Sequence, residues 1–378
     1  MTGEVTGVYG RLGVRPLINA NAWLTRLGGS LMPPEVIEAM REASAAFVDM
    51  HELQRAVSSR IAQLTRNEAA LVCSGASAGL VLATLACMTG RDLRALGRLI
   101  QLGVGTLPKR DVIVHCGQRT PYDPAIVLAG GRLVQIGNVI QTFEWELQAA
   151  IGPATAAVLY LPGEIYSRGA LPLERVLAIA HAAGVPVIVD AAAQLPPPEN
   201  LWRFAEMGAD LVLFSGGKAL RGPQASGLIV GKPDMVAACE MHAAPHQRLG
   251  RPMKVGKEEM CGLLAAVELY LAQDHAARTA EIERITAAWV ETLGALPGVC
   301  ARRDFPSEAG QPLPRARLDL EPSLGLTSGD VRAALLAGEP PIDVAVSGER
   351  AVLLNAALLK PGEETIVTDR VAEALRRP

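Results

Sequence analysis

Short hydrophobic runs alternate with longer amphipathic stretches between residues 68 and 231 of the 378-residue chain. Apolar runs bounded by glycine, proline or polar residues are typical of buried strands, and the stretches between them have the length of helices. The expected strands lie at 68–73, 155–164, 185–189 and 211–214, with two more inside 111–137 and a last, antiparallel one at 226–231. This alternation predicts an α/β fold with a doubly wound, mostly parallel sheet.

The flanking segments predict a division into domains. Residues 1–30 are rich in glycine and turn-like, and we expect an arm that packs on another part of the protein. A large domain is predicted over 31–250 and a smaller α+β domain over 251–378, with a long helix from Glu258 to about Leu296. With 49% hydrophobic residues, the chain is long enough to bury two cores.

Two of the predicted strands end abruptly in polar groups. The run 185–189 is followed by Asp190, and the run 211–214 by the segment Ser215–Lys218. Ligands of parallel sheets bind outside the carboxyl ends of the strands, so we expect the acid and the lysine to share one site. The alternative is structural, with Asp190 as a helix cap and Lys218 as a solvated loop residue.

The pair of Lys218 and Asp190 is typical of pyridoxal phosphate sites. A lysine amine forms a Schiff base with the cofactor aldehyde, and a carboxylate keeps the pyridine nitrogen protonated so that the ring accepts electrons. Gly216-Gly217 leaves space beside the lysine. A nucleotide-binding Walker loop also contains Gly-Lys, but Val212 and Ala219 stand where it needs a glycine and a hydroxyl residue. The pattern therefore favours pyridoxal phosphate, with both residues catalytic.

A small-residue turn supplies a candidate phosphate site. The stretch SGASAGLVLATLACM (74–88) leads from the first strand of the large domain into an apolar helix, whose positive end would face an anion. The residues whose N–H groups would contact the cofactor phosphate are Ser74, Gly75, Ala76 and Ser77. A serine at this point is also a common helix cap. Ser215 could donate to the same phosphate, or serve only as a turn residue.

Three blocks of the sequence resemble one family of pyridoxal phosphate proteins. They are SGGKALRGPQASG (215–227), VPVIVDAAAQLPPPENL (185–201) and GRPMKVGKEEM (250–260). They look like the bacterial proteins related to selenocysteine synthase, a group that includes D-glucosaminate-6-phosphate ammonia-lyase. The likeness runs from YGRLGVRPLINA (9–20) through PGEE (361–364). The resemblance implies the fold type I, aspartate aminotransferase-like architecture, with Lys218 as the Schiff-base lysine.

The resemblance also indicates which residues surround the cofactor ring. In the loop HCGQRTPYD (115–123), Gln118 occupies the place that faces the ring, where relatives carry histidine. His115 is the alternative, although by periodicity it belongs to the preceding strand and fits a hydrogen-bonded core residue. Arg119 could meet an anionic substrate or the cofactor phosphate.

Further substrate contacts are expected from two segments. Arg26 lies in the arm that approaches the active site in the resembled family, or it makes a structural bond to a backbone carbonyl. Lys254 and Lys257, together with Arg251, could bind a substrate phosphate or carboxylate or the cofactor phosphate of a partner subunit, or they could form a solvated basic turn. Relatives carry a glycine where this chain has Ala22-Trp23, which predicts a bulkier pocket wall and a different substrate.

Composition and charge argue against several classes of protein. A formal net charge of −3 gives no indication of a nucleic-acid partner. The six cysteines are scattered without a CxxC or Cys/His cluster, so we expect no metal site and free thiols of a reducing cytoplasm. No apolar run reaches the length of about 18 residues that a membrane span needs. We therefore expect a cytoplasmic protein that binds a small molecule.

The predicted reaction is that of a lyase acting on a hydroxylated amino acid or amino sugar acid. The Lys218 amine would remove the Cα proton, and loss of the β-hydroxyl would lead to a keto acid and ammonia. Racemisation or epimerisation, a selenium-transferase-like β-replacement, and a non-catalytic cofactor-binding protein remain alternatives. Fold type I sites are normally completed by a second subunit. We expect a homodimer or larger assembly, with residues 1–30 and 241–260 contributing across the interface.

Overall fold

The computed structural model describes residues 7–376, and the chain divides into two compact units. The larger unit comprises residues 30–273 and 309–311, and the smaller one the remaining segments, up to 29, 274–308 and from 312 onward. The division falls later than the predicted boundary at 250/251, because the helix at Lys257–Ala272 packs on two helices of the larger unit. Residues 1–6 of the predicted arm lie outside the described residues.

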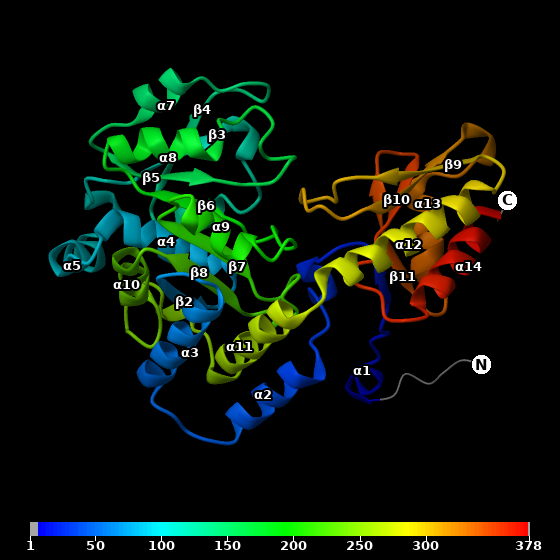
Figure 1. Ribbon diagram of the computed structural model, residues 1–378, viewed down its shortest axis with the longest axis horizontal. Coiled ribbons are helices and arrows are strands. Elements are labelled where there is room, and N and C mark those ends of the chain that lie inside the picture. The colour runs from blue at the N-terminus through cyan, green and yellow to red at the C-terminus, as the bar shows by residue number, and fades with distance from the viewer. Residues whose placement is uncertain (1–6, 377–378) are drawn as a thin grey trace. The chain divides into compact units, whose positions relative to one another are not determined.

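A seven-stranded sheet forms the centre of the larger unit (Figure 1). In spatial order its strands are β2 (Ala69–Cys73), β8 (Gly227–Gly231), β7 (Leu211–Ser215), β6 (Val187–Asp190), β5 (Thr155–Tyr160), β3 (Asp111–His115) and β4 (Arg132–Ile136). Neighbours from β7 to β4 are parallel, whereas β8 is antiparallel to both β7 and β2. The doubly wound, mostly parallel sheet predicted from the sequence is confirmed.

Helices cover both faces of this sheet. The helices of the larger unit are α2 (Pro34–Ser44), α3 (Met50–Leu64), α4 (Ala76–Thr89), α5 (Leu93–Leu102), α6 (Pro124–Leu128), α7 (Glu144–Ala150), α8 (Leu173–Ala182), α9 (Asn200–Glu206), α10 (Pro233–His242) and α11 (Lys257–Ala272), and α2 packs on α11. Successive strand side chains point to opposite faces. Val187 and Val189 of β6 therefore join one core with α3, α8, α9 and α11, while Ile188 joins the other with α4 and α10. Both faces of the strands are apolar, as a sheet covered on both sides requires.

The amino-terminal edge of this sheet is held by a buried carboxylate. Asp210 directly precedes β7 and accepts hydrogen bonds from the backbone N–H of Val187 at 2.7 Å, from Lys232 Nζ at 2.6 Å and from His181 Nε2 at 2.8 Å. These bonds satisfy the buried acid within the protein. This edge is therefore structural, and the opposite edge, where β2, β6 and β7 end, carries the predicted site residues.

The smaller unit is a five-stranded sheet packed on helices. In spatial order its strands are β1 (Ile18–Ala20), β11 (Ile342–Ser347), β12 (Ala351–Leu354), β10 (Arg315–Leu320) and β9 (Val299–Asp304). The core lies against α12 (His275–Gly294), α13 (Ser328–Ala337) and α14 (Glu363–Arg376). The short helix α1 (Gly7–Arg11) precedes β1. Because β1 pairs in parallel with β11, part of the predicted arm is an edge strand of this sheet.

The long helix predicted from Glu258 to Leu296 is two helices in the structure. α11 ends at Ala272, and the extended Gln273 follows it. The Asp274 side chain then accepts the N–H of Ala277 as the N-cap of α12. A single aspartate in a charge-rich stretch is a weak signal, which is why the pattern did not reveal the break.

Candidate active site

The polar ends of β6 and β7 lie side by side. Asp190 is paired with Leu213 in the parallel ladder, two residues before β7 ends at Ser215. Lys218 follows a two-glycine turn and is close enough for its positive charge to lower the pKa of the Asp190 carboxyl. The structure thus brings together the acid and the lysine that the sequence predicted at these strand ends.

The Asp190 carboxyl is in a low-dielectric environment. Burial raises the pKa of this group, and that effect outweighs the opposing ones. The opposing effects are the N–H of Ala192, which donates to Oδ1 at 3.1 Å, and the charge of Lys218. Burial penalises the ionised form, so an additional cation beside Asp190 would favour it. A protonated pyridine nitrogen is such a cation.

The turn that carries Lys218 is tightly packed. A Cβ on Gly217 would approach the Cα of Gln224 to 2.6 Å, and one on Gly216 would lie 2.0 Å from the Oγ of Ser226. Only glycine fits at these two positions without a shift of the neighbouring atoms. The glycine pair therefore allows the turn to fold back on the segment that follows it.

The amino end of α4 lies against the start of β8. Gly75 precedes the helix with φ 97° and carries no capping side chain. A Cβ on Gly227 would lie 2.5 Å from the carbonyl carbon of Gly75 and 2.7 Å from the nitrogen of Ala76. Ser215 is paired with Gly227 and so borders the same helix end. The first N–H groups of a helix have no intrahelical acceptor, so those of Ala76 and Ser77 can hold a phosphate.

The side chain of Ser74 has a structural partner next to an open cavity. Its hydroxyl donates to the carbonyl oxygen of Met253 at 2.8 Å. The cavity has a volume of about 910 Å³, and its lining includes Ser74 and Ser77 together with the apolar Val81, Val127 and Met253. A mostly apolar lining with a few polar groups is typical of a small-molecule site.

The two candidates for the face of the cofactor ring are both fully buried. Gln118 donates to the carbonyl of Leu161 at 2.9 Å and accepts from its N–H at 3.2 Å, so its amide ties the loop after β3 to the end of β5. His115 packs edge-on against Tyr160 with ring centroids 5.9 Å apart. Burial lowers the pKa of His115 to about 4, so this ring is neutral at pH 7. The two bonds of Gln118 favour a structural role for this residue, and its contact with the cofactor ring stays a prediction. Both ring nitrogens of His115 are buried without a hydrogen-bond partner among residues 7–376, so His115 is not the hydrogen-bonded core residue that was its alternative.

Three predicted basic contacts belong to the larger unit. Arg119 forms an ion pair with Asp123, and Lys257 forms one with Glu258. Lys254 is exposed. Arg119 also donates to Gln135 of β4 at 3.1 Å, and Lys257 donates to the carbonyl of Ala43 in α2 at 2.6 Å. Because Arg119 and Lys257 are engaged in these contacts, Lys254 is the one of the three that is most open to a ligand from solvent.

In the smaller unit, Arg26 binds a buried carboxylate. Asp343 of β11 is fully buried and accepts from Arg26, from two nitrogens of Arg332 at 2.7 and 3.0 Å, and from Asn21 at 3.1 Å. The partner of Arg26 is therefore this carboxylate and not the backbone carbonyl considered as its alternative. Sequence reasoning missed Asp343. The sequence does contain one signal, because Asp343 is the single acidic residue inside the apolar run 342–346. A buried charge needs a partner, so such a residue predicts an arginine or lysine beside it.

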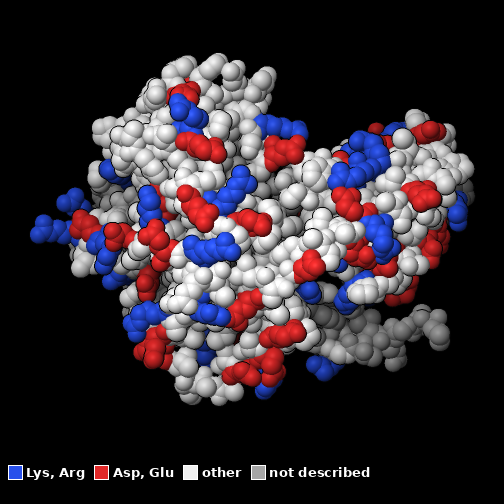
Figure 2. All heavy atoms as spheres, in the orientation of Figure 1, with Lys and Arg blue, Asp and Glu red and all other residues white. Residues whose placement is uncertain are grey.

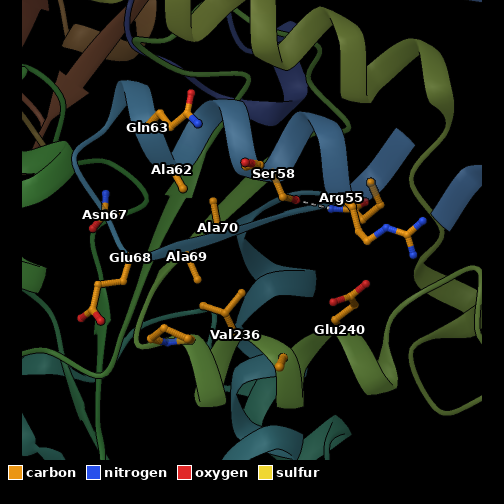
Figure 3. Close-up of a pocket in the computed structure, with 14 residues that line it drawn as sticks. Arg55, Ser58, Ala62, Gln63, Asn67, Glu68, Ala69, Ala70, Val236 and Glu240 are labelled. Carbon is orange, nitrogen blue, oxygen red and sulfur yellow. Dashed lines mark hydrogen bonds between the residues drawn. The ribbon is translucent and has the colours of Figure 1, made fainter. Parts of the chain in front are cut away.

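A second cavity, of about 370 Å³, lies between α3, β2 and α10 (Figure 3). Arg55 and Glu240 line one side of it, and Ala69 and Ala70 of β2 line its centre. These alanines are at the amino end of β2, whereas Ser74 follows its carboxyl end. None of the predicted site residues lines this cavity. The cavity is therefore separate from the strand ends that carry Asp190 and Lys218.

Solved structures of the same architecture carry pyridoxal phosphate. The K265A variant of serine palmitoyltransferase from S. paucimobilis, with a bound pyridoxal phosphate–myriocin aldimine, has a TM-score of 0.59 at 15% identity, over 95% of this chain and 87% of that one. This likeness shows the fold alone. The present residues also fit the cofactor, because Asp190 suits its ring nitrogen, Lys218 its aldehyde and the start of α4 its phosphate. The protein is a pyridoxal phosphate-dependent enzyme of fold type I.

Within that class, the chain belongs to the L-seryl-tRNA selenium transferase family, whose profile matches residues 18–294. A 5'-C-glycyluridine monooxygenase-decarboxylase of a Streptomyces species is 36% identical over 378 residues, covering 97% of this chain and 92% of the relative. D-glucosaminate-6-phosphate ammonia lyase of Salmonella typhimurium is 35% identical over 338 residues, covering 88% and 87%. A solved D-glucosaminate-6-phosphate ammonia-lyase has a TM-score of 0.84 at 32% identity, over 98% of both chains. The family predicted from the sequence is confirmed.

A methyl group at Gly227 is expected to weaken cofactor binding. The Cβ of Gly227→Ala would collide with Gly75 and Ala76, so the start of α4 must move. We expect about tenfold weaker binding of pyridoxal phosphate, the equivalent of one charge-assisted hydrogen bond, in a titration followed by absorbance. Gly97→Ala is the matched control, because a Cβ at Gly97 of α5 meets nothing within 4 Å. Equal affinity in the two variants would contradict the phosphate assignment.

Proposed function

We propose that this enzyme is an ammonia-lyase acting on a hydroxylated amino acid or amino sugar acid. The observation that carries the proposal is the placement of Asp190 beside Lys218 at the carboxyl ends of β6 and β7. A relative named D-glucosaminate-6-phosphate ammonia lyase, 35% identical over 88% of this chain, supports the type of reaction. The substrate is a small molecule with an amino group on Cα and a hydroxyl on the next carbon.

Lys218 acts twice in this proposal. Its amine would hold the cofactor through the aldehyde, and once free of the aldehyde the same amine would take the proton from Cα of the substrate. A lysine amine has an ordinary pKa of about 10.4, which burial and a neighbouring cationic ring would lower toward the working pH. Bound pyridoxal phosphate supplies an electron-accepting ring that stabilises the charge left at Cα.

The remaining groups orient the cofactor. Asp190 would keep the ring nitrogen of the bound cofactor protonated. The charge of that protonated nitrogen would offset the burial that otherwise disfavours the ionised carboxylate. The proposed phosphate contacts are the N–H groups at the start of α4 and the neighbouring hydroxyl, in Ser74, Gly75, Ala76, Ser77 and Ser215. These groups would hold the cofactor at its ring nitrogen and at its phosphate, so that the proton at Cα of the substrate would face Lys218.

The elimination needs no oxidant. The Cα–H bond breaks toward Lys218, and the Cβ–O bond breaks as the hydroxyl leaves with a proton as water. The resulting enamine takes up water and gives a keto acid and ammonia. Both products carry atoms of the substrate and of water alone, so ammonia release under anaerobic conditions identifies this reaction.

Positive charge in the smaller unit suits an anionic group of the substrate. Arg26 and Arg332 share the single carboxylate of Asp343, so the cluster retains a net positive charge. The side chain of Arg26 is 49% exposed. We propose Arg26 as a contact for a carboxylate or phosphate of the substrate, with Arg119, Lys254 and Lys257 as the further candidates from the larger unit.

A second candidate function is an oxygen-dependent decarboxylation. The specific observation in its favour is the monooxygenase-decarboxylase of Streptomyces, 36% identical over 97% of this chain. The decarboxylation would consume dioxygen and release carbon dioxide, whereas the ammonia-lyase reaction does neither. Racemisation and β-replacement would release neither ammonia nor carbon dioxide.

A tRNA substrate, which the family name includes, has little electrostatic support. On the face shown in Figure 2, lysine and arginine are interspersed with aspartate and glutamate over the surface. The formal net charge of the chain is −3. Recognition of a phosphate backbone depends on clustered cations, so a small substrate suits this face better.

We further propose a cytoplasmic homodimer or larger assembly. Large apolar side chains are fully or mostly exposed, among them Phe47 before α3 and Val127 and Leu128 beside the 910 Å³ cavity. Contiguous exposed apolar side chains, such as the adjacent Val127 and Leu128, suit a surface that another chain covers. Among residues 7–376, no helix is long and apolar enough to cross a membrane. Light scattering of the purified protein measures the assembly, and a monomer with full activity would contradict it.

A substrate screen tests the proposed reaction. The loaded enzyme is incubated without oxygen with hydroxylated amino acids and amino sugar acids, with and without a phosphate group, from both stereochemical series. Ammonia and a keto acid in equal amounts are the expected result for at least one compound. Turnover only with dioxygen, with release of carbon dioxide, would favour the second candidate. Exchange of Cα hydrogen for deuterium without ammonia would favour a racemase.

A further inference from the structure

We infer that Ser30 is a positioning residue for Lys218, an inference that rests on the role proposed for that lysine. The Ser30 Oγ lies 2.8 Å from the carbonyl oxygen of Lys218 and 3.1 Å from that of Gly217. A hydroxyl has one hydrogen, so the two carbonyls share it. Ser30 is the first residue of the larger unit and stands 188 positions before the lysine in the sequence.

A second side chain joins the same two segments, the one that begins at Ser30 and the one that carries Lys218. Arg221 donates from Nε to the carbonyl of Leu31, next to Ser30, at 3.0 Å. Its φ of 56° lies in the left-handed region, which is uncommon for a residue with a side chain. In that conformation its N–H donates to the carbonyl of Lys218 at 2.9 Å. The Lys218 carbonyl thus accepts from both Ser30 and Arg221.

These bonds fix the peptide planes on both sides of the Lys218 Cα. The lysine side chain is long and flexible, so the direction in which it leaves the backbone decides where its amine can lie. Proton transfer and covalent attachment depend on that position, and a displacement of about 1 Å can cost about 10²-fold in rate. Asp190 is held separately by the β6 ladder. Loss of the Ser30 hydroxyl should therefore change the rate at which Lys218 attaches the cofactor and the pH at which the attached cofactor titrates, while Asp190 stays in place.

The test compares the full-length protein with Ser30→Ala, Ser30→Thr and Ser44→Ala variants. Ser44 is a matched control, because its hydroxyl also donates to a backbone carbonyl, that of Arg41, at 2.7 Å. Pyridoxal phosphate is added to each protein, and two quantities are measured. They are the rate at which the visible absorption of the covalently bound cofactor develops, and the pH midpoint at which that absorption changes.

For Ser30→Ala we expect about tenfold slower attachment and a shift of the pH midpoint by about half a unit or more, with a melting temperature near that of the parent. Ser30→Thr keeps the hydroxyl and should behave as the parent, as should Ser44→Ala. If Ser30→Ala does not fold, Arg221→Ala probes the same junction and should show the same slowing and shift.

Two outcomes overturn the inference in distinguishable ways. A folded Ser30→Ala protein with the rate and midpoint of the parent would remove Ser30 from the mechanism and leave Lys218 in it. A parent protein that develops no absorption with pyridoxal phosphate would remove the proposed function, and the inference with it.

Discussion

Lys218→Ala is expected to release ammonia at least about 10³-fold more slowly than the parent enzyme on the best substrate of the screen. The variant loses the covalent attachment of the cofactor and also the base that takes the Cα proton. Cofactor can still enter through its phosphate and ring contacts, so the protein is expected to stay folded. The measurement is the initial rate of ammonia formation at saturating pyridoxal phosphate.

An exposed lysine of the same unit provides the control for this variant. Lys109 precedes β3, at the sheet edge opposite the strand ends that carry the site. Lys109→Ala should keep the rate of the parent. A Lys218→Ala enzyme that turned over as fast as Lys109→Ala would show that another group is the base.

Asp190→Asn is expected to change stability and activity in opposite directions. Burial raises the pKa of Asp190 above its ordinary value of 3.8, so the ionised form is disfavoured in the folded protein. An acid with a raised pKa contributes its full stability below its unfolded pKa, and this contribution is lost as the pH rises through the folded pKa. A neutral amide of similar shape avoids that loss. The empty Asp190→Asn protein should therefore melt at or above the temperature of the empty parent at pH 7.

With the cofactor bound, the same substitution is expected to be harmful. Asparagine cannot keep the ring nitrogen protonated, and the rate of ammonia release should fall by about 10² to 10³-fold, as when one preorganised electrostatic group is removed. Melting temperatures of empty and loaded protein and the rate are measured together. Asp234→Asn is the control, because the Asp234 side chain is 90% exposed. A loaded Asp190→Asn enzyme with the parent rate would refute the ring contact.

The sheet and the strand-end residues were predictable because they follow from local pattern. Apolar runs such as 185–189 and 211–214 indicate buried strands, and the rule that parallel strands end at one edge then places Asp190 near Lys218. The antiparallel β8 was also expected, and the comparisons confirm the family that the lysine block indicated. The strands and the polar residues at their ends could be predicted because each depends on residues that are neighbours in the chain.

Contacts between distant segments were not predictable in the same way. Arg26 and Asp343 are 317 residues apart, and Ser30 and Lys218 are 188 apart, so no local pattern links them. The Gln118 amide is occupied by the backbone of Leu161, 43 residues away, which an assignment based on loop position could not foresee. The boundary at Gln273 depends on the packing of α11 against α2 and α3. Each of these outcomes is decided by tertiary packing.

The most direct test of the account is to reduce the protein with borohydride in the presence of pyridoxal phosphate and to locate the label by peptide mass spectrometry. We expect one labelled peptide, with the pyridoxyl phosphate group on Lys218. For Asp190→Asn we expect the same label at cofactor concentrations that saturate the protein, and a strong loss of label at lower concentrations. An unlabelled protein, or a label on Lys254 or Lys257 with Lys218 unmodified, would contradict the account.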